Sequence, residues 1–172
     1  KLGFNEATAL ECKGQSLLAD MEMCEKYGFD YIEIRFDYVK DYLQEHTLEE
    51  LADWFKNHHL KPWAYNTLNY FNQRDEEGRK EIDDEGDFLL KVSKAIGMKM
   101  LITVPNFDVK DKSVSEIKEE AVERLRYLSD KVGADMKISL EFCGAPNCSI
   151  NQCCTAYDEV KAVDRDNVGI TG

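Results

Sequence analysis

Two groups of residues that could do chemistry stand close together in the segment KISLEFCGAPNCSINQCC, residues 137–154. The first is a single carboxylate, Glu141, at the end of an apolar run of strand length. No Lys or Arg stands directly beside it, and a partly buried carboxylate needs a partner or a metal. Its hard oxygen atoms suit Mg, Mn or Zn in a mixed carboxylate and histidine site. Glu141 is therefore the first candidate for metal binding and catalysis.

The second group is a set of thiols in the loop that follows Glu141. Four of the chain's six cysteines lie there, with the spacing Cys-x4-Cys-x4-Cys-Cys: Cys143, Cys148, Cys153 and Cys154. The paired Cys-x2-Cys knuckles and partner histidines of common zinc folds are missing from this pattern. Thiols in a cytosolic protein stay mostly reduced. We therefore expect these cysteines to have packing and loop roles.

The elements that position these groups follow a repeated β-α-β order. Strand-length apolar runs alternate with segments of helical period at 16–28, 47–59, about 79–97, 114–132 and 150–163. Ser16, Thr47, Ser113 and Ser149 are expected near helix N-termini, and Thr47 with Glu50 predicts a capping box. Because the strands are apolar on both faces, the sheet should be parallel and covered by helices.

Five βα units and a sixth strand, NVGITG, predict an α/β fold in a single domain over residues 1–172. Six parallel strands fit either an open doubly wound sheet or most of a (β/α)8 TIM barrel. No glycine-rich nucleotide motif follows the first strand, which favours the barrel. A parallel strand without its covering helix is unusual, so we expect the chain to be truncated.

In such a barrel the polar residues at the C-terminal strand ends are the candidates for chemistry. Besides Glu141, the candidates for binding substrate hydroxyl groups are Asn5, Glu6, Arg35, Asn66 and Asn106. Each of them also suits an ordinary role in capping a helix or pairing within a loop. Trp63, Tyr65, Tyr70 and Phe71 could wall a sugar-sized pocket, but we expect most of them to pack in the core.

Composition excludes several classes of partner. The formal net charge is -12, and no cluster of Lys and Arg is present to bind nucleic acid or an anionic membrane. No apolar stretch is long enough to span a membrane, and the N-terminus lacks a signal-peptide pattern. We expect a cytoplasmic protein that acts on a small molecule, with a homo-oligomer as an open possibility.

Several segments resemble the xylose-isomerase-like TIM barrel superfamily, and within it the inosose isomerase branch. They are LGFNEATALE, MCEKYGFDYIEIR, HTLEELADWFKNHHLKPWAYNTLNYFNQRDEEG, LEFCGAPNCSIN and VDRDNVGI. The resemblance implies a divalent metal, Zn, Mn or Mg, held at the barrel mouth by Glu, Asp, His and Glu. It places the first Glu on Glu141 and the Asp just after the strand that begins VGI, where this chain has Thr171 and Gly172. The His and the second Glu would lie further on.

The resemblance further implies an isomerase that shifts the ketone of a keto-inositol by proton transfer through an enediol, in inositol catabolism. In that reaction a base removes a proton next to the carbonyl and a metal stabilises the enediol oxygen. Glu141 is the carboxylate expected to take part. Two alternatives stay open: another sugar isomerase or epimerase of the same superfamily, or a non-catalytic barrel fragment that only binds.

Overall fold

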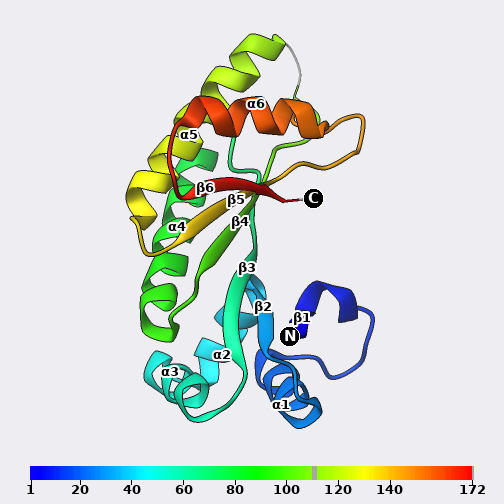
Figure 1. The fold of residues 1–172 in the computed structure, drawn as a ribbon, viewed down its shortest axis with the longest axis vertical. Coiled ribbons are helices and arrows are strands. Elements are labelled where there is room, and N and C mark those ends of the chain that lie inside the picture. Colours follow the sequence, from blue (N-terminus) through cyan, green and yellow to red (C-terminus); the bar gives the residue numbers. More distant parts are fainter. Residues whose placement is uncertain (110–111, 172) are drawn as a thin grey trace. The chain divides into compact units, whose positions relative to one another are not determined.

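The structure is a computed structural model that describes residues 1–109 and 112–171. Its strands are β1 (Gly3–Asn5), β2 (Tyr31–Arg35), β3 (Lys61–Asn69), β4 (Met100–Val104), β5 (Lys137–Glu141) and β6 (Val168–Thr171). Its helices are a short 3-10 helix η1 (Glu6–Ala9), α1 (Leu17–Tyr27), α2 (Phe36–Glu45), α3 (Leu48–Asn57), α4 (Glu76–Ile96), α5 (Val114–Val132) and α6 (Cys153–Val163). Helices follow strands throughout, as the sequence pattern predicted (Figure 1).

The six strands are parallel and follow one another in the sheet order β1-β2-β3-β4-β5-β6. A doubly wound open sheet reverses its strand order at a switch point, whereas a TIM barrel adds each strand next to the previous one. The consecutive order therefore supports the barrel over the open sheet.

The chain divides into two compact units. Unit 1 comprises residues 1–66 and 89–99, and unit 2 comprises the described residues of 67–88 and 100–172. The expectation of a single domain over the whole chain stays a prediction.

Unit 1 contains β1, β2, most of β3, and helices α1, α2 and α3. Strand β2 alternates between fully buried Ile32 and Ile34 and partly exposed Tyr31, Glu33 and Arg35. Because successive strand side chains point to opposite faces, the isoleucines face the helix layer and Glu33 faces the other side. Helices α1 and α2 both contact β2, and their buried side chains complete this core.

Unit 2 contains β4, β5 and β6, with α5 and α6 in contact with each other and with the strands (Figure 1). Leu101, Leu125, Ile138, Leu140 and Ala156 are buried between strands and helices. Each of the buried leucine and isoleucine side chains contributes roughly 1.5–3 kcal/mol relative to exposure. This core fixes the end of β5, where Glu141 lies.

Most of the expected helix boundaries are confirmed. Ser16, Thr47 and Ser113 are N-cap residues whose hydroxyls accept hydrogen bonds from the first turn, and Thr47 and Ser113 both form capping boxes. Ser149 was wrongly placed at a helix start: α6 begins at Cys153, and the backbone N–H of Ser149 donates to Asn106 instead. Helix α2 was not predicted at all.

Candidate functional site

Three side chains of unit 1 form a hydrogen-bonded cluster around Glu33. Oε1 of Glu33 accepts hydrogen bonds from the side-chain amides of Asn5, at 2.8 Å, and Asn66, at 2.6 Å. The amide of Asn66 also lies 3.4 Å from Oδ1 of Asn5. All three residues are half-buried. The cluster therefore presents carboxylate and amide groups, which are the groups that bind hydroxyls in polar pockets.

The strand register explains why these residues meet. Asn5 on β1 pairs with Glu33 on β2, and Arg35 at the end of β2 pairs with Asn66 on β3. A register shift between Ile32 and Glu33 brings the later residues of β2 into this alignment. Asn66 was expected after the third strand, but β3 continues to Asn69, so Asn66 lies within it.

Glu6 is fully buried at the start of η1, although it was predicted to bind hydroxyls. Its Oε2 accepts a 2.6 Å hydrogen bond from the backbone N–H of Arg35, and so links η1 to the end of β2. Its Oε1 has no hydrogen-bond partner among the residues that the structure describes. Burial raises the pKa of Glu6 to about 8, so this carboxyl is mostly protonated at neutral pH. Its role in substrate binding stays a prediction.

The guanidinium of Arg35 is held by Asp37 through two hydrogen bonds, of 2.9 Å from Nε and 2.7 Å from Nη2. It also lies 5.5 Å from the ring centroid of Tyr38. A bidentate pair of this kind fixes the orientation of the guanidinium. Arg35 thus ends β2 as an ordered cation.

Glu141 is the last residue of β5 and is half-buried, and it pairs in register with Thr171 of β6. Its position at the carboxyl end of β5, between β4 and β6, agrees with the sequence analysis. Within residues 1–109 and 112–171, however, no three His, Cys, Asp or Glu side chains gather where they could hold a metal ion. The described residues alone do not form a metal site, and the role of Glu141 as a ligand stays a prediction.

Asn106 follows β4 and uses its side chain within unit 2. Its amide donates to the carbonyl of Gln73 at 3.2 Å, and its Oδ1 accepts from the backbone N–H of Phe107 at 2.9 Å. Its own backbone N–H donates to Oδ1 of Asn72 at 2.7 Å. In this structure Asn106 joins loops, and its proposed contact with substrate stays a prediction.

The cysteines occupy mixed environments. Cys24 and Cys148 are buried, Cys143 is half-buried, and Cys12, Cys153 and Cys154 are exposed. The Cys148 thiol donates to the carbonyl of Ile150 at 3.3 Å, which helps to shape the loop after Glu141. Burial raises the pKa of the Cys143 thiol, which disfavours the thiolate that a metal ligand requires. These contacts agree with packing and loop roles.

The four aromatic residues in and directly after β3 divide into two pairs. Tyr65 and Phe71 are buried in the core, whereas Trp63 and Tyr70 expose about 42% and 43% of their surface. Tyr70 contacts Phe107 edge to face, with ring centroids 6.2 Å apart. Two of the four therefore pack in the core, so the expectation that most of them do is not met.

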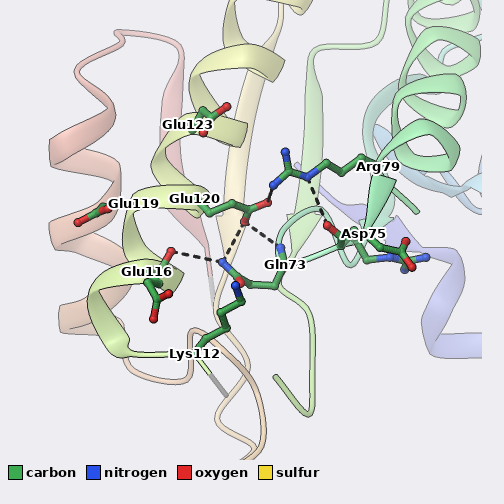
Figure 2. A pocket seen from close by; sticks show the side chains of 9 residues that line it. Gln73, Asp75, Arg79, Lys112, Glu116, Glu119, Glu120 and Glu123 are labelled. Carbon is green, nitrogen blue, oxygen red and sulfur yellow. Dashed lines mark hydrogen bonds and ion pairs between the residues drawn. The ribbon is translucent and has the colours of Figure 1, made fainter. Parts of the chain in front are cut away.

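A polar cavity of about 520 Å³ lies within unit 2, between the beginnings of α4 and α5. Figure 2 shows the Glu120 carboxylate, which comes from α5, pointing toward Gln73 and Arg79. The cavity is lined by Gln73, Arg74, Asp75, Arg79, Lys112, Glu116, Glu119, Glu120 and Glu123. The cavity is lined by both basic and acidic side chains. Two of them, Glu120 and Arg79, form an ion pair with each other at 3.2 Å.

The sequence profile of the xylose isomerase-like TIM barrel family matches residues 21–171. The chain belongs to this family. It is 45% identical over 172 residues to inosose isomerases of Bacillus velezensis and Bacillus subtilis, covering 99% of this chain and 61% of each relative. A crystal structure of an IolI protein with a bound zinc atom superposes with a TM-score of 0.93 at 45% identity, covering 99% of this chain and 61% of that one.

The chain thus spans 61% of the length of the curated relatives that it matches. Its fold is the corresponding part of the TIM barrel of this family. Among the described residues, none of the helices has both the length and the apolar character needed to cross a membrane.

Glu33 is the common acceptor of the unit 1 cluster, and Asn72 joins the loops of unit 2. Sequence reasoning did not single out Asn72. No local signal points to it, because its partners are 34 and 77 positions away in the sequence.

Proposed function

We propose that the chain is part of a metal-dependent inosose isomerase, which moves the ketone of a keto-inositol to the neighbouring carbon. The observation that carries this proposal is the 45% identity over 172 residues to enzymes of that name. The polar cluster of Asn5, Glu33 and Asn66 on β1, β2 and β3 supports it, because a polyol substrate requires several hydroxyl-binding groups.

The reaction requires a proton to leave the carbon next to the carbonyl and a proton to return to the former carbonyl carbon. A carboxylate held at a strand end can take and return that proton, provided that it lies within hydrogen-bond reach of the substrate. Glu141 is the residue of this chain that we assign to this role. Its half-buried position limits access of bulk water to the carboxylate.

The remaining polar residues bind and orient the substrate in this proposal. The amides of Asn5 and Asn66, with the carboxylate of Glu33 between them, provide donors and an acceptor for hydroxyl groups. Arg35 in unit 1 and Asn106 in unit 2 are each candidates for contacts with substrate hydroxyl groups. When a divalent metal is bound, it polarises the substrate carbonyl. We assign one of its ligands to Glu141 and the others to parts of the full-length protein outside residues 1–172.

The test is isomerisation of a keto-inositol by the full-length protein in D₂O, followed by ¹H NMR. We expect substrate interconversion together with loss of the proton signal next to the carbonyl. Glu141→Gln should lower metal content and turnover together, whereas Glu22→Gln, at an exposed position of α1, should change neither. The proposal is wrong if the metal-loaded wild-type protein neither interconverts keto-inositols nor exchanges that proton.

A further inference from the structure

Asn72 is a fully buried polar residue that contacts two different strand-end loops of unit 2. Its Oδ1 accepts a 2.7 Å hydrogen bond from the backbone N–H of Asn106, which follows β4. Its Nδ2 donates to Oγ of Ser149, 3.3 Å away in the loop after β5. A buried amide satisfied on both sides by separate segments ties those segments to its own.

The backbone on both sides of Asn72 is strained, so surrounding contacts must hold this segment in its conformation. Tyr70 has a φ of 56° and Gln73 a φ of 54°, and both therefore lie in the left-handed region that bulky residues avoid. Such conformations cost on the order of 1–3 kcal/mol each and persist only where surrounding contacts enforce them. The backbone N–H of Phe71, between these two residues, donates to the carbonyl of Val104 in β4 at 3.3 Å.

A second anchor holds the same segment to helix α5. Oε2 of Glu120 accepts hydrogen bonds from the backbone N–H of Gln73, at 2.8 Å, and from its side-chain amide, at 3.1 Å. Oε1 of Glu120 is held by Arg79 at 3.2 Å (Figure 2). Gln73 also accepts from the side chain of Asn106. These bonds supply the contacts that enforce the left-handed conformation of Gln73.

The loops after β4 and β5 are also joined to each other. The N–H of Ser149 donates to the carbonyl of Asn106 at 2.9 Å, and the N–H of Asp108 donates to the carbonyl of Asn147 at 2.8 Å. The two ends of the loop after β5 are also bonded to each other: the N–H of Cys143 donates to the carbonyl of Ile150 at 3.3 Å. Cys143 stands two residues after Glu141, so this chain of contacts runs from Asn72 to the end of β5.

We propose that Asn72 is a positioning residue that holds the loops after β3, β4 and β5 together and thereby fixes the segment that leaves Glu141. The role of Asn72 in catalysis rests on the proposed function. The role of Asn72 in holding the loops does not rest on it, because the loop contacts are present in unit 2 whatever the reaction is. Asn72 acts through these loops and is not assigned a contact with substrate.

Amide hydrogen exchange on the full-length protein tests the structural part. Asn72→Ala should accelerate exchange at the N–H groups of Asn106, Cys143 and Ser149 by at least about tenfold, because their loops open locally. Amides inside α5 should keep their rates. Ser149→Ala, which removes only one of the two bonds, is the milder variant if Asn72→Ala does not fold. Asn72→Asp should restore slow exchange, because burial keeps such a carboxyl protonated, and a protonated carboxyl can accept from Asn106 N–H and donate to Oγ of Ser149.

Steady-state kinetics with a keto-inositol test the catalytic part. We expect Asn72→Ala to lower kcat by about 10- to 100-fold, as small misplacements of catalytic groups do, while KM changes less than about threefold. Asn72→Asp should recover most of kcat, and Asn57→Ala, an exposed asparagine of α3, should match wild type.

Three outcomes would overturn the assignment of Asn72: unchanged exchange at the three amides, equal acceleration throughout α5 and β5, or faster loop exchange with an unchanged kcat. A wild-type protein without isomerase activity would instead contradict the proposed function. In that case the exchange rates would still decide whether Asn72 holds the loops.

Discussion

Asn66 donates a 2.6 Å hydrogen bond from its side-chain amide to Oε1 of Glu33, and that oxygen also accepts from Asn5. One carboxylate oxygen therefore aligns residues from three neighbouring strands of unit 1. Removing the Glu33 carboxylate leaves two half-buried amides without their acceptor. The loss of folding free energy is then larger than the net contribution of the two hydrogen bonds.

Glu33→Ala should therefore lower the free energy of unfolding by about 1–3 kcal/mol, a loss typical of orphaned polar groups. Glu33→Gln retains an acceptor oxygen in the same place and should cost less than about 1 kcal/mol. Urea unfolding of the two variants measures the difference. If both variants lose the same stability, the charge of Glu33 and not its acceptor geometry holds the cluster.

Glu6 should make stability depend on pH. Its folded pKa, raised by burial to about 8, exceeds the ordinary value of 4.5, so between these values the folded state binds more protons than the unfolded state. Stability should therefore fall as pH rises through this window, with a slope of up to about 1.4 kcal/mol per pH unit. Glu6→Gln should remove most of this slope in urea unfolding measured at pH 5, 7 and 9.

Glu6→Gln should not remove the whole dependence of unfolding free energy on pH, because charged groups near Glu6 also contribute to it. Asp20 is also buried, with a raised pKa, while Arg35 lowers and Asp37 raises the pKa of Glu6. Glu22→Gln, at an exposed position of α1, is the matched control and should preserve the wild-type slope. An unchanged slope in Glu6→Gln would show that Glu6 is ionised in the folded protein.

Glu159 should destabilise unit 2 at high pH. It is 1% exposed on α6, its Oε2 has no hydrogen-bond partner among the described residues, and burial raises its pKa to about 8. Ionisation above that pH places a charge in the core, which Lys118 offsets only in part. Glu159→Gln should raise the thermal midpoint at pH 9 by about 4–8 °C, as expected for ~2 kcal/mol in a domain of this size.

The same comparison at pH 4, below both the ordinary pKa of 4.5 and the raised pKa of about 8, should give nearly equal midpoints, because Glu159 is then mostly protonated in both the folded and the unfolded state. Asp158→Asn, on the exposed side of α6, controls for the loss of one negative charge. A gain of the same size in this control would assign the effect to net charge and not to burial.

The thiol of Cys148 should not take part in metal binding. It is buried and donates to the carbonyl of Ile150, a contact that a serine hydroxyl can retain. Cys148→Ser should therefore leave the metal content of the full-length protein unchanged, as measured by atomic absorption. Loss of one zinc per chain in this variant would mean that the thiols, and not Glu141, form the metal centre.

Local signals were sufficient for the elements whose ends are specified by neighbouring residues. Ser16, Thr47 and Ser113 bond to amides three positions ahead, so each helix start is encoded within one turn. Helix α2 escaped prediction because its N-cap, Arg35, makes no side-chain capping bond and the helix follows β2 without a break. Helix α6 was predicted to start too early because the residues before Cys153 form contacts within the loop and with other loops.

The sequence by itself determined the α/β class, the parallel strands and the strand ends on which Asn5 and Glu141 stand, because periodicity and capping act over a few residues. Only the tertiary structure decided that Glu6 is buried against Arg35, that Glu33 joins Asn5 to Asn66, and that Asn72 reaches Ser149. These contacts join residues 28 to 77 positions apart. Their partners are selected by strand register and loop packing, which no local pattern encodes.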